Sequence, residues 1–165
     1  MIIKPFEVEK KNLKQNRFFL LYGENQGFKN EIIKKNFSKN VYQYEENEII
    51  NNEEKFFNNI LSKSFFENEK TIIICRATDK IKDIIEEIIE KDVKDLIIIL
   101  NSNNLEKKSK IRSFFEKDKR TICIPFYEDN SQTLISIANT FFRNNKVPIS
   151  QQSINLIVER CRGDR

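Results

Sequence analysis

A glycine-containing turn near the N-terminus carries the residues whose types and spacing suit phosphate binding. The P-loop pattern G-x-x-x-x-G-K-[ST] surrounds phosphates with backbone N–H groups, extends a lysine to the outer phosphates and holds magnesium with a hydroxyl. Here Gly23 and Lys29 fit this pattern, but Phe28 replaces the second glycine and Asn30 replaces the hydroxyl residue. Gly27 comes one residue early. We interpret the turn as a degenerate P-loop that does not bind ATP productively.

The two replacements act on different parts of a phosphate site. A side chain as bulky as Phe28 should crowd the space where the backbone must approach phosphate, and the amide of Asn30 is a poor substitute for a magnesium-binding hydroxyl. A simpler interpretation is that Gly23 and Gly27 only form a tight turn, with Lys29 on the solvated face of the helix that follows. Both interpretations predict no ATPase activity, no catalytic residues and no cofactor.

Short apolar runs alternate with helical patterns along the chain. The runs are rich in isoleucine and other apolar residues, which is typical of strands buried on both faces of a parallel sheet. The pattern predicts an α/β fold with about five parallel strands and helices on both faces. The expected strands cover 18–22, 41–44, 71–75, 96–100 and 121–124, and the fifth is ended by Pro125.

A break at Val147-Pro148 interrupts this alternation. We therefore predict an α/β domain over 1–147 and, over 148–165, the first helix of a second, helical domain that is truncated. Ser150 is placed to cap that last helix.

The amino-acid composition argues against metal-binding and membrane proteins. The chain has 165 residues, a net charge of +4 and no histidine, and its cysteines, Cys75, Cys123 and Cys161, are widely separated. A metal site is therefore not expected, and reduced cysteines suit a cytoplasmic protein. We find no apolar stretch long enough to cross a bilayer and no signal peptide, so no membrane partner is expected.

The end of the third expected strand lacks the acids that an active AAA+ ATPase places there. Residues 72–77 contain no aspartate or glutamate. Asp79 lies beyond them and is interpreted as an N-cap ahead of Ile81. The G-x-G-x-x-G pattern of a Rossmann dehydrogenase is also absent. Both parts of an ATPase site, the P-loop and the acidic residues after the third strand, are thus degenerate or absent in this sequence.

Several stretches together resemble the delta subunit of the bacterial DNA polymerase III clamp loader. They are residues 18–25, Ser64-Phe65-Phe66 ahead of the third strand, 96–101 and 159–165. The resemblance implies an AAA+-like, P-loop NTPase-type fold followed by the start of a helical lid domain. It also implies a non-catalytic subunit that binds the sliding clamp and helps to open it for loading onto primed DNA. The implied partners are the clamp (beta subunit), the delta prime and tau/gamma subunits, and DNA through the assembled complex.

The family binds the clamp through a serine followed by two bulky apolar residues, here Ser64, Phe65 and Phe66. The aromatic pair lies between polar residues, which suits a small hot spot on the surface. From the residue pattern alone, both rings could instead belong to the core. The resemblance favours the clamp interpretation.

Two other functions remain open. The retained Gly23 and Lys29 motivate a divergent P-loop NTPase or nucleotide kinase. A third possibility is a scaffold that uses the sheet domain only for subunit packing. Two basic clusters, 107–112 and 117–120, are interpreted as solvated helix surface in preference to a contact with DNA phosphates.

Overall fold

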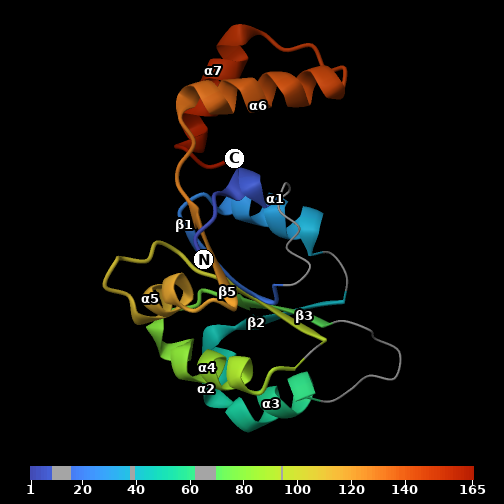
Figure 1. Cartoon of the computed structure of the whole chain (residues 1–165). Helices are drawn as coiled ribbons and strands as arrows, with labels where there is room; N and C mark the ends of the chain where they lie inside the picture. The colour runs from blue at the N-terminus through green and yellow to red at the C-terminus, as the bar shows by residue number, and fades with distance from the viewer. Residues whose placement is uncertain (9–15, 38–39, 62–69, 94) are drawn as a thin grey trace.

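The computed structural model describes residues 1–8, 16–37, 40–61, 70–93 and 95–165, and Figure 1 shows the arrangement of its elements. In chain order these are η1 (Pro5–Glu7), β1 (Phe18–Gly23), α1 (Gln26–Asn36), β2 (Val41–Glu45), α2 (Glu46–Asn51), α3 (Glu53–Leu61), β3 (Lys70–Cys75), η3 (Asp79–Ile81), α4 (Lys82–Glu90), β4 (Leu96–Asn101), α5 (Lys110–Lys117), β5 (Thr121–Phe126), α6 (Ser131–Asn144) and α7 (Gln151–Cys161).

The sheet has five strands in the order β2-β3-β4-β1-β5, and every neighbouring pair is parallel. This confirms the predicted parallel sheet. β1 is an inner strand between β4 and β5, and all six of its residues are buried, as the continuous apolar run predicted.

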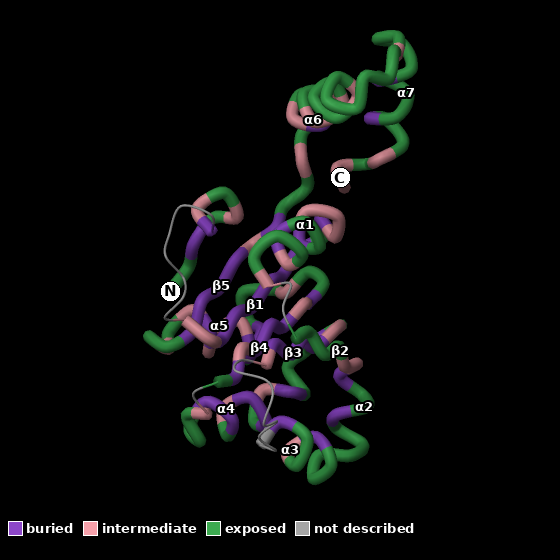
Figure 2. Tube along the Cα trace, turned by 90° about the vertical axis from the view of Figure 1, so that its right-hand side faces the viewer, coloured by how far each residue is buried: buried purple, intermediate pink, exposed green. Residues whose placement is uncertain are grey.

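Helices cover both faces of the sheet, and alternate strand residues point to opposite cores. Phe18 and Leu20 of β1 pack in one core with residues of α2, α3, α4 and α5. Phe19 and Leu21 pack in the other core, with Ile32 of α1 and Ile3 of the N-terminal segment. Figure 2 shows the buried strands lying between these two layers.

β5 continues through Pro125 to Phe126, so the expectation that Pro125 ends this strand is wrong. The reason is the position of β5 at the edge of the sheet. The Cys123 N–H points to the outer side, where it donates to the Met1 carbonyl at 2.9 Å. Pro125 is two residues later, so its nitrogen points to the same outer side. The missing N–H therefore removes no hydrogen bond between β5 and β1.

α6 and α7 form a small hydrophobic cluster of their own. Leu134 of α6 packs with Ile154 and Val158 of α7, and the two helices lie together, apart from the sheet, in Figure 1. Apolar packing thus groups α6 with α7, although the sequence placed the division after α6, at Pro148. Ser150 caps α7 as predicted, since its side chain accepts from the Ser153 N–H. Among the described residues, no helix is long and apolar enough to cross a membrane.

Candidate functional site

The candidate site lies at the carboxyl end of β1, where the sheet topology changes direction. β1 lies between β4 and β5, and the chain leaves it through α1 to reach β2 at the far edge. In open α/β sheets, ligands bind in the crevice at such a switch point. The residues of the degenerate P-loop are at this position.

The connection from β1 to α1 is too short to form a phosphate-binding loop. Only Glu24 and Asn25 separate the end of the strand at Gly23 from the start of α1 at Gln26. Asn25 caps the helix, because its side-chain oxygen accepts from the Phe28 N–H at 3.0 Å. A P-loop needs several successive backbone N–H groups free to surround phosphate, and here the chain is already helical at those positions.

Lys29 is fully buried rather than on the solvated face of α1, so the simpler interpretation was wrong about its position. Its ammonium donates to the Gly23 carbonyl at 2.9 Å and to the Ser102 carbonyl, beyond the end of β4, at 2.7 Å. The lysine that would reach outer phosphates in a P-loop is thus turned inward and joins the ends of two strands. Burial lowers the pKa of Lys29 to about 8, although nearby Asp164 opposes this shift.

This lowered pKa predicts a specific pH dependence of stability. Between pH 8 and the ordinary lysine pKa of 10.5, Lys29 is more fully protonated in the unfolded chain than in the folded chain. The free energy of unfolding therefore rises with pH over this range. We expect the stability of the natural chain relative to a Lys29→Met variant to increase from pH 7 to pH 10 in urea titrations. Parallel stability curves for the two proteins would contradict a buried, titrating Lys29.

A carboxylate of the chain itself lies at the N-terminus of α1. After α7, Arg162 and Gly163 adopt left-handed backbone conformations and turn the chain back toward α1. Asp164 Oδ1 then accepts from the Gly27 N–H at 2.7 Å. Exposed N–H groups at a helix N-terminus attract anions, and here Asp164 satisfies that preference from within the chain.

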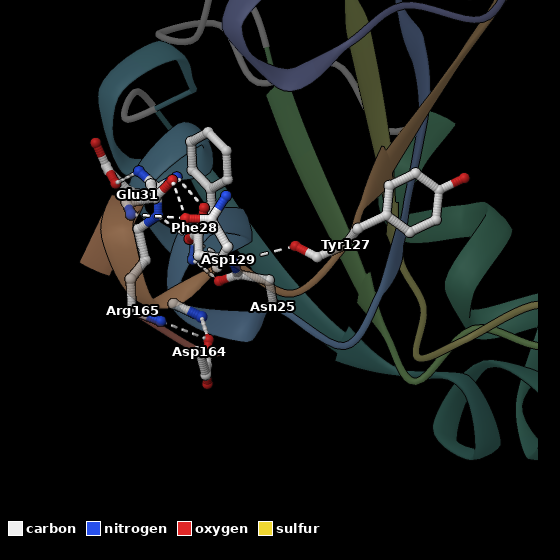
Figure 3. Close-up of polar contacts among 10 residues, drawn as sticks. Asn25, Phe28, Glu31, Tyr127, Asp129, Asp164 and Arg165 are labelled. Carbon is white, nitrogen blue, oxygen red and sulfur yellow. Dashed lines mark hydrogen bonds and ion pairs between the residues drawn. The ribbon is translucent and has the colours of Figure 1, made fainter. Parts of the chain in front are cut away.

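Arg165 adds an ion-pair network to the same place, drawn in Figure 3. Its guanidinium contacts both carboxylate oxygens of Asp129, at 2.8 and 3.1 Å, and its central carbon lies 3.5 Å from the centre of the Phe28 ring. Asn25 also donates to Asp129, at 2.8 Å. The network ties together the start of α1, the β5–α6 connection and the turn after α7.

The structure thus brings together four of the five residues of the degenerate P-loop. Phe28 packs edge-on against Phe126 and under Arg165, so its ring has a structural contact of its own. Asn30 differs from the other four, because it lies exposed on α1 and accepts from Gln26 at 3.1 Å. Sequence reasoning missed Asp129 altogether, and it used Asp164 and Arg165 only as part of a family resemblance.

The end of β3 is occupied by structural contacts. Arg76 pairs with Glu45 at 2.7 Å. Thr78, and not Asp79, caps the turn before Ile81, which corrects the sequence interpretation. Asp79 instead accepts from the Ser109 hydroxyl at 2.6 Å and, at the start of α5, from the Ile111 N–H at 3.0 Å. Partial burial opposes the charged form, but these hydrogen bonds hold the pKa of Asp79 below its usual value.

The predicted clamp-binding residues Ser64, Phe65 and Phe66 lie outside the described residues. Within the described part of the chain, no group of three or more cysteine, aspartate or glutamate residues is placed to hold a metal ion.

Comparison with known proteins identifies the fold. No protein-family model and no curated protein sequence matches the chain. Among solved structures, it is similar to the Bacillus subtilis DNA clamp loader delta protein (YqeN), with a TM-score of 0.60 and 13% identity over 93% of this chain and 51% of that one. It is also similar to the Thermotoga maritima RuvB Holliday junction branch migration motor, with a TM-score of 0.58 and 13% identity over 96% of this chain and 54% of that one.

These likenesses, together with the strand order, define the α/β part as an AAA+-like fold of the P-loop NTPase type, as the sequence predicted. The chain spans about half the length of these solved structures.

Proposed function

We propose that this chain is a non-catalytic clamp-loader subunit of the delta type, which binds a sliding clamp and helps to open it. The observation that carries the proposal is the candidate site, where the chain's own groups take the hydrogen bonds that a nucleotide would need. Lys29 bonds to Gly23 and Ser102, and Asp164 bonds to the start of α1. The domain keeps the AAA+-like fold, but its own side chains occupy the position of the nucleotide site. This suits a subunit that binds a partner protein and does not hydrolyse ATP.

The clamp contact is proposed for Ser64, Phe65 and Phe66. The described residues on either side are Leu61, at the end of α3, and Lys70, at the start of β3. Lys70 lies at the amino end of its strand, opposite the edge that holds the degenerate P-loop. Clamp binding through this segment would therefore leave the candidate site untouched. Capture of a bacterial sliding clamp by the immobilised chain tests the proposal, and failure to capture it would contradict it.

The proposed setting is the cytoplasmic replication machinery, with the delta prime and tau/gamma subunits as neighbours and DNA reached through the assembled complex. It is supported by the sequence resemblance and by the fold likeness to the Bacillus subtilis protein. The alternative, a divergent P-loop NTPase or nucleotide kinase, requires Lys29 to leave two hydrogen bonds in a buried position.

A calorimetric titration with ATP and magnesium separates these functions. We expect no saturable binding at ATP concentrations up to about 1 mM, because the β1–α1 connection is short and Lys29 is already bonded.

The control is a P-loop NTPase measured in the same buffer. A micromolar dissociation constant that Lys29→Ala abolishes would instead favour the NTPase.

A further inference from the structure

The two edges of the sheet differ in how they are covered. β5 forms one edge, and the N-terminal segment lies along it: Cys123 donates to the Met1 carbonyl at 2.9 Å and accepts from the Ile3 N–H at 3.1 Å. β2 forms the other edge, as Figure 2 shows. Among the described residues, no segment pairs with the outer side of β2. An uncovered strand edge is a template for pairing with another chain.

The backbone groups that β2 turns outward belong to alternate residues. β2 and β3 pair in parallel and in continuous register. The Thr71 N–H of β3 donates to the Asn40 carbonyl at 3.0 Å, so Asn40 faces β3. Because the backbone polar groups of successive residues point to opposite sides of a strand, those of Val41, Gln43 and Glu45 face outward.

Two of these residues have open backbone groups. The Glu45 N–H donates to the Glu48 carboxylate at 3.0 Å, where α2 begins. The N–H and C=O groups of Val41 and Gln43 have no hydrogen-bond partner among the described residues. Natural proteins protect such edges with lysine, proline or a bulge. Residues 41–44 contain neither lysine nor proline, and their continuous pairing with β3 includes no bulge.

Side chains along this edge are uncovered as well. Val41 and Tyr42 are 40% and 39% exposed, although both are large hydrophobic residues. A hollow of about 350 Å³ lies beside them between α1 and β2, and its lining includes Ile33, Phe37 and Gln43. Exposed hydrophobic surface next to open backbone groups indicates an interaction site.

We propose that β2 pairs antiparallel with β2 of a second copy of this chain, about a two-fold axis at Tyr42. In this register Val41 of each copy lies opposite Gln43 of the other, and the two residues exchange N–H···O=C bonds. Every open backbone group of Val41 and Gln43 then gains a partner. An axis at Gln43 would instead place Val41 opposite Glu45, whose N–H is already bonded.

The strand is complementary to itself in side chains as well as in backbone groups, as a two-fold interface requires. Tyr42 of one copy lies opposite Tyr42 of the other, with Cα atoms about 4.5 Å apart, and aromatic pairs at such positions stabilise antiparallel strands. Residues 41–44 carry no charge, so the two strands do not repel each other. The inference goes beyond the proposed function, because clamp binding requires no second copy.

Sedimentation velocity of the 165-residue chain between about 1 and 200 μM tests the proposal, and we expect a monomer–dimer equilibrium. Gln43→Pro should raise the dimer dissociation constant at least about tenfold, because it removes an outward N–H from both copies. The fold should persist, since this N–H faces away from β3 as the Pro125 nitrogen faces away from β1.

A charge on the edge provides a second variant with a matched control. Val41→Lys should also weaken the dimer at least about tenfold, because lysine on a strand edge opposes pairing. The control is Val147→Lys, at a valine that is 48% exposed and lies outside the sheet. It adds the same charge and should dimerise like the natural chain. If Gln43→Pro unfolds, this pair of variants decides the outcome.

Cysteine cross-linking tests the register. Under mild oxidation, Tyr42→Cys should form a disulfide between two copies, because Cα atoms about 4.5 Å apart are within the span of a disulfide. Val41→Cys should not, since the two Val41 positions are diagonal neighbours roughly 7–8 Å apart. Non-reducing electrophoresis measures both variants, with the natural chain as the background from its own cysteines.

Several results would overturn the proposal. A natural chain that stays monomeric at about 200 μM would leave the edge of β2 to an extended segment of a different protein. A dimer that both edge variants leave intact would place the interface elsewhere. Equal losses for Val41→Lys and Val147→Lys would assign dimerisation to net charge. Equal cross-linking of Tyr42→Cys and Val41→Cys would contradict the two-fold register.

Discussion

Replacing both Phe65 and Phe66 with alanine should weaken binding of a sliding clamp by well over about tenfold. The reason is that an aromatic ring buried in a partner pocket contributes roughly 2 kcal/mol or more as a hot spot. The melting temperature should change little, because side chains exposed in the free protein contribute little to folding. Surface plasmon resonance with immobilised clamp and thermal unfolding of the same preparations measure the two quantities.

The matched control is Phe141→Ala, which removes an exposed aromatic side chain from α6. It should change neither clamp affinity nor the melting temperature appreciably. The opposite outcome has a clear signature: if Phe65 and Phe66 belong to the core, the double variant loses several kcal/mol of stability, as buried phenylalanine truncations do. Clamp affinity that is intact per folded molecule would then place the clamp site elsewhere.

Gly23→Ala should destabilise the fold by about 3 kcal/mol, because Gly23 is retained for backbone geometry and not for phosphate binding. Its φ is +123°, a backbone conformation that residues other than glycine rarely adopt. In addition, a Cβ at this position would lie 2.0 Å from the Phe126 carbonyl oxygen in β5. Neither strand can move away without losing the β1–β5 ladder that pairs these two residues. The melting temperature should fall by about 10 °C in calorimetry.

Gly27→Ala provides the comparison within the same turn. Its Cβ would meet the Arg165 carbonyl, but Arg165 belongs to the turn after α7 and not to the sheet. That turn can shift, and alanine also favours the helix in which residue 27 lies. We expect a loss well below that of Gly23→Ala. Equal losses at the two glycines, or an unchanged melting temperature for Gly23→Ala, would contradict this assignment.

Local sequence was sufficient to predict the architecture of the α/β part. Short runs such as Ile72–Ile74 and 96–100 cannot bury their side chains unless both faces of a strand are covered, and helical spacing between the runs supplies the covering layers. Local sequence was also sufficient to show that the P-loop pattern is degenerate. Phe28 and Asn30 stand where a P-loop needs glycine and a hydroxyl, and this can be read without knowing where either side chain points.

The tertiary structure alone decided what fills the candidate site. The Gly27 N–H and the Asp164 carboxylate that it contacts are 137 residues apart in sequence, and Lys29 and the Ser102 carbonyl are 73 apart. Residue periodicity specifies which face of an element is apolar, but it carries no information about which distant polar groups meet at the end of a sheet. For the same reason, the sequence could not group α6 with α7 or show that the N-terminal segment covers the edge of β5, since each depends on how separate segments pack.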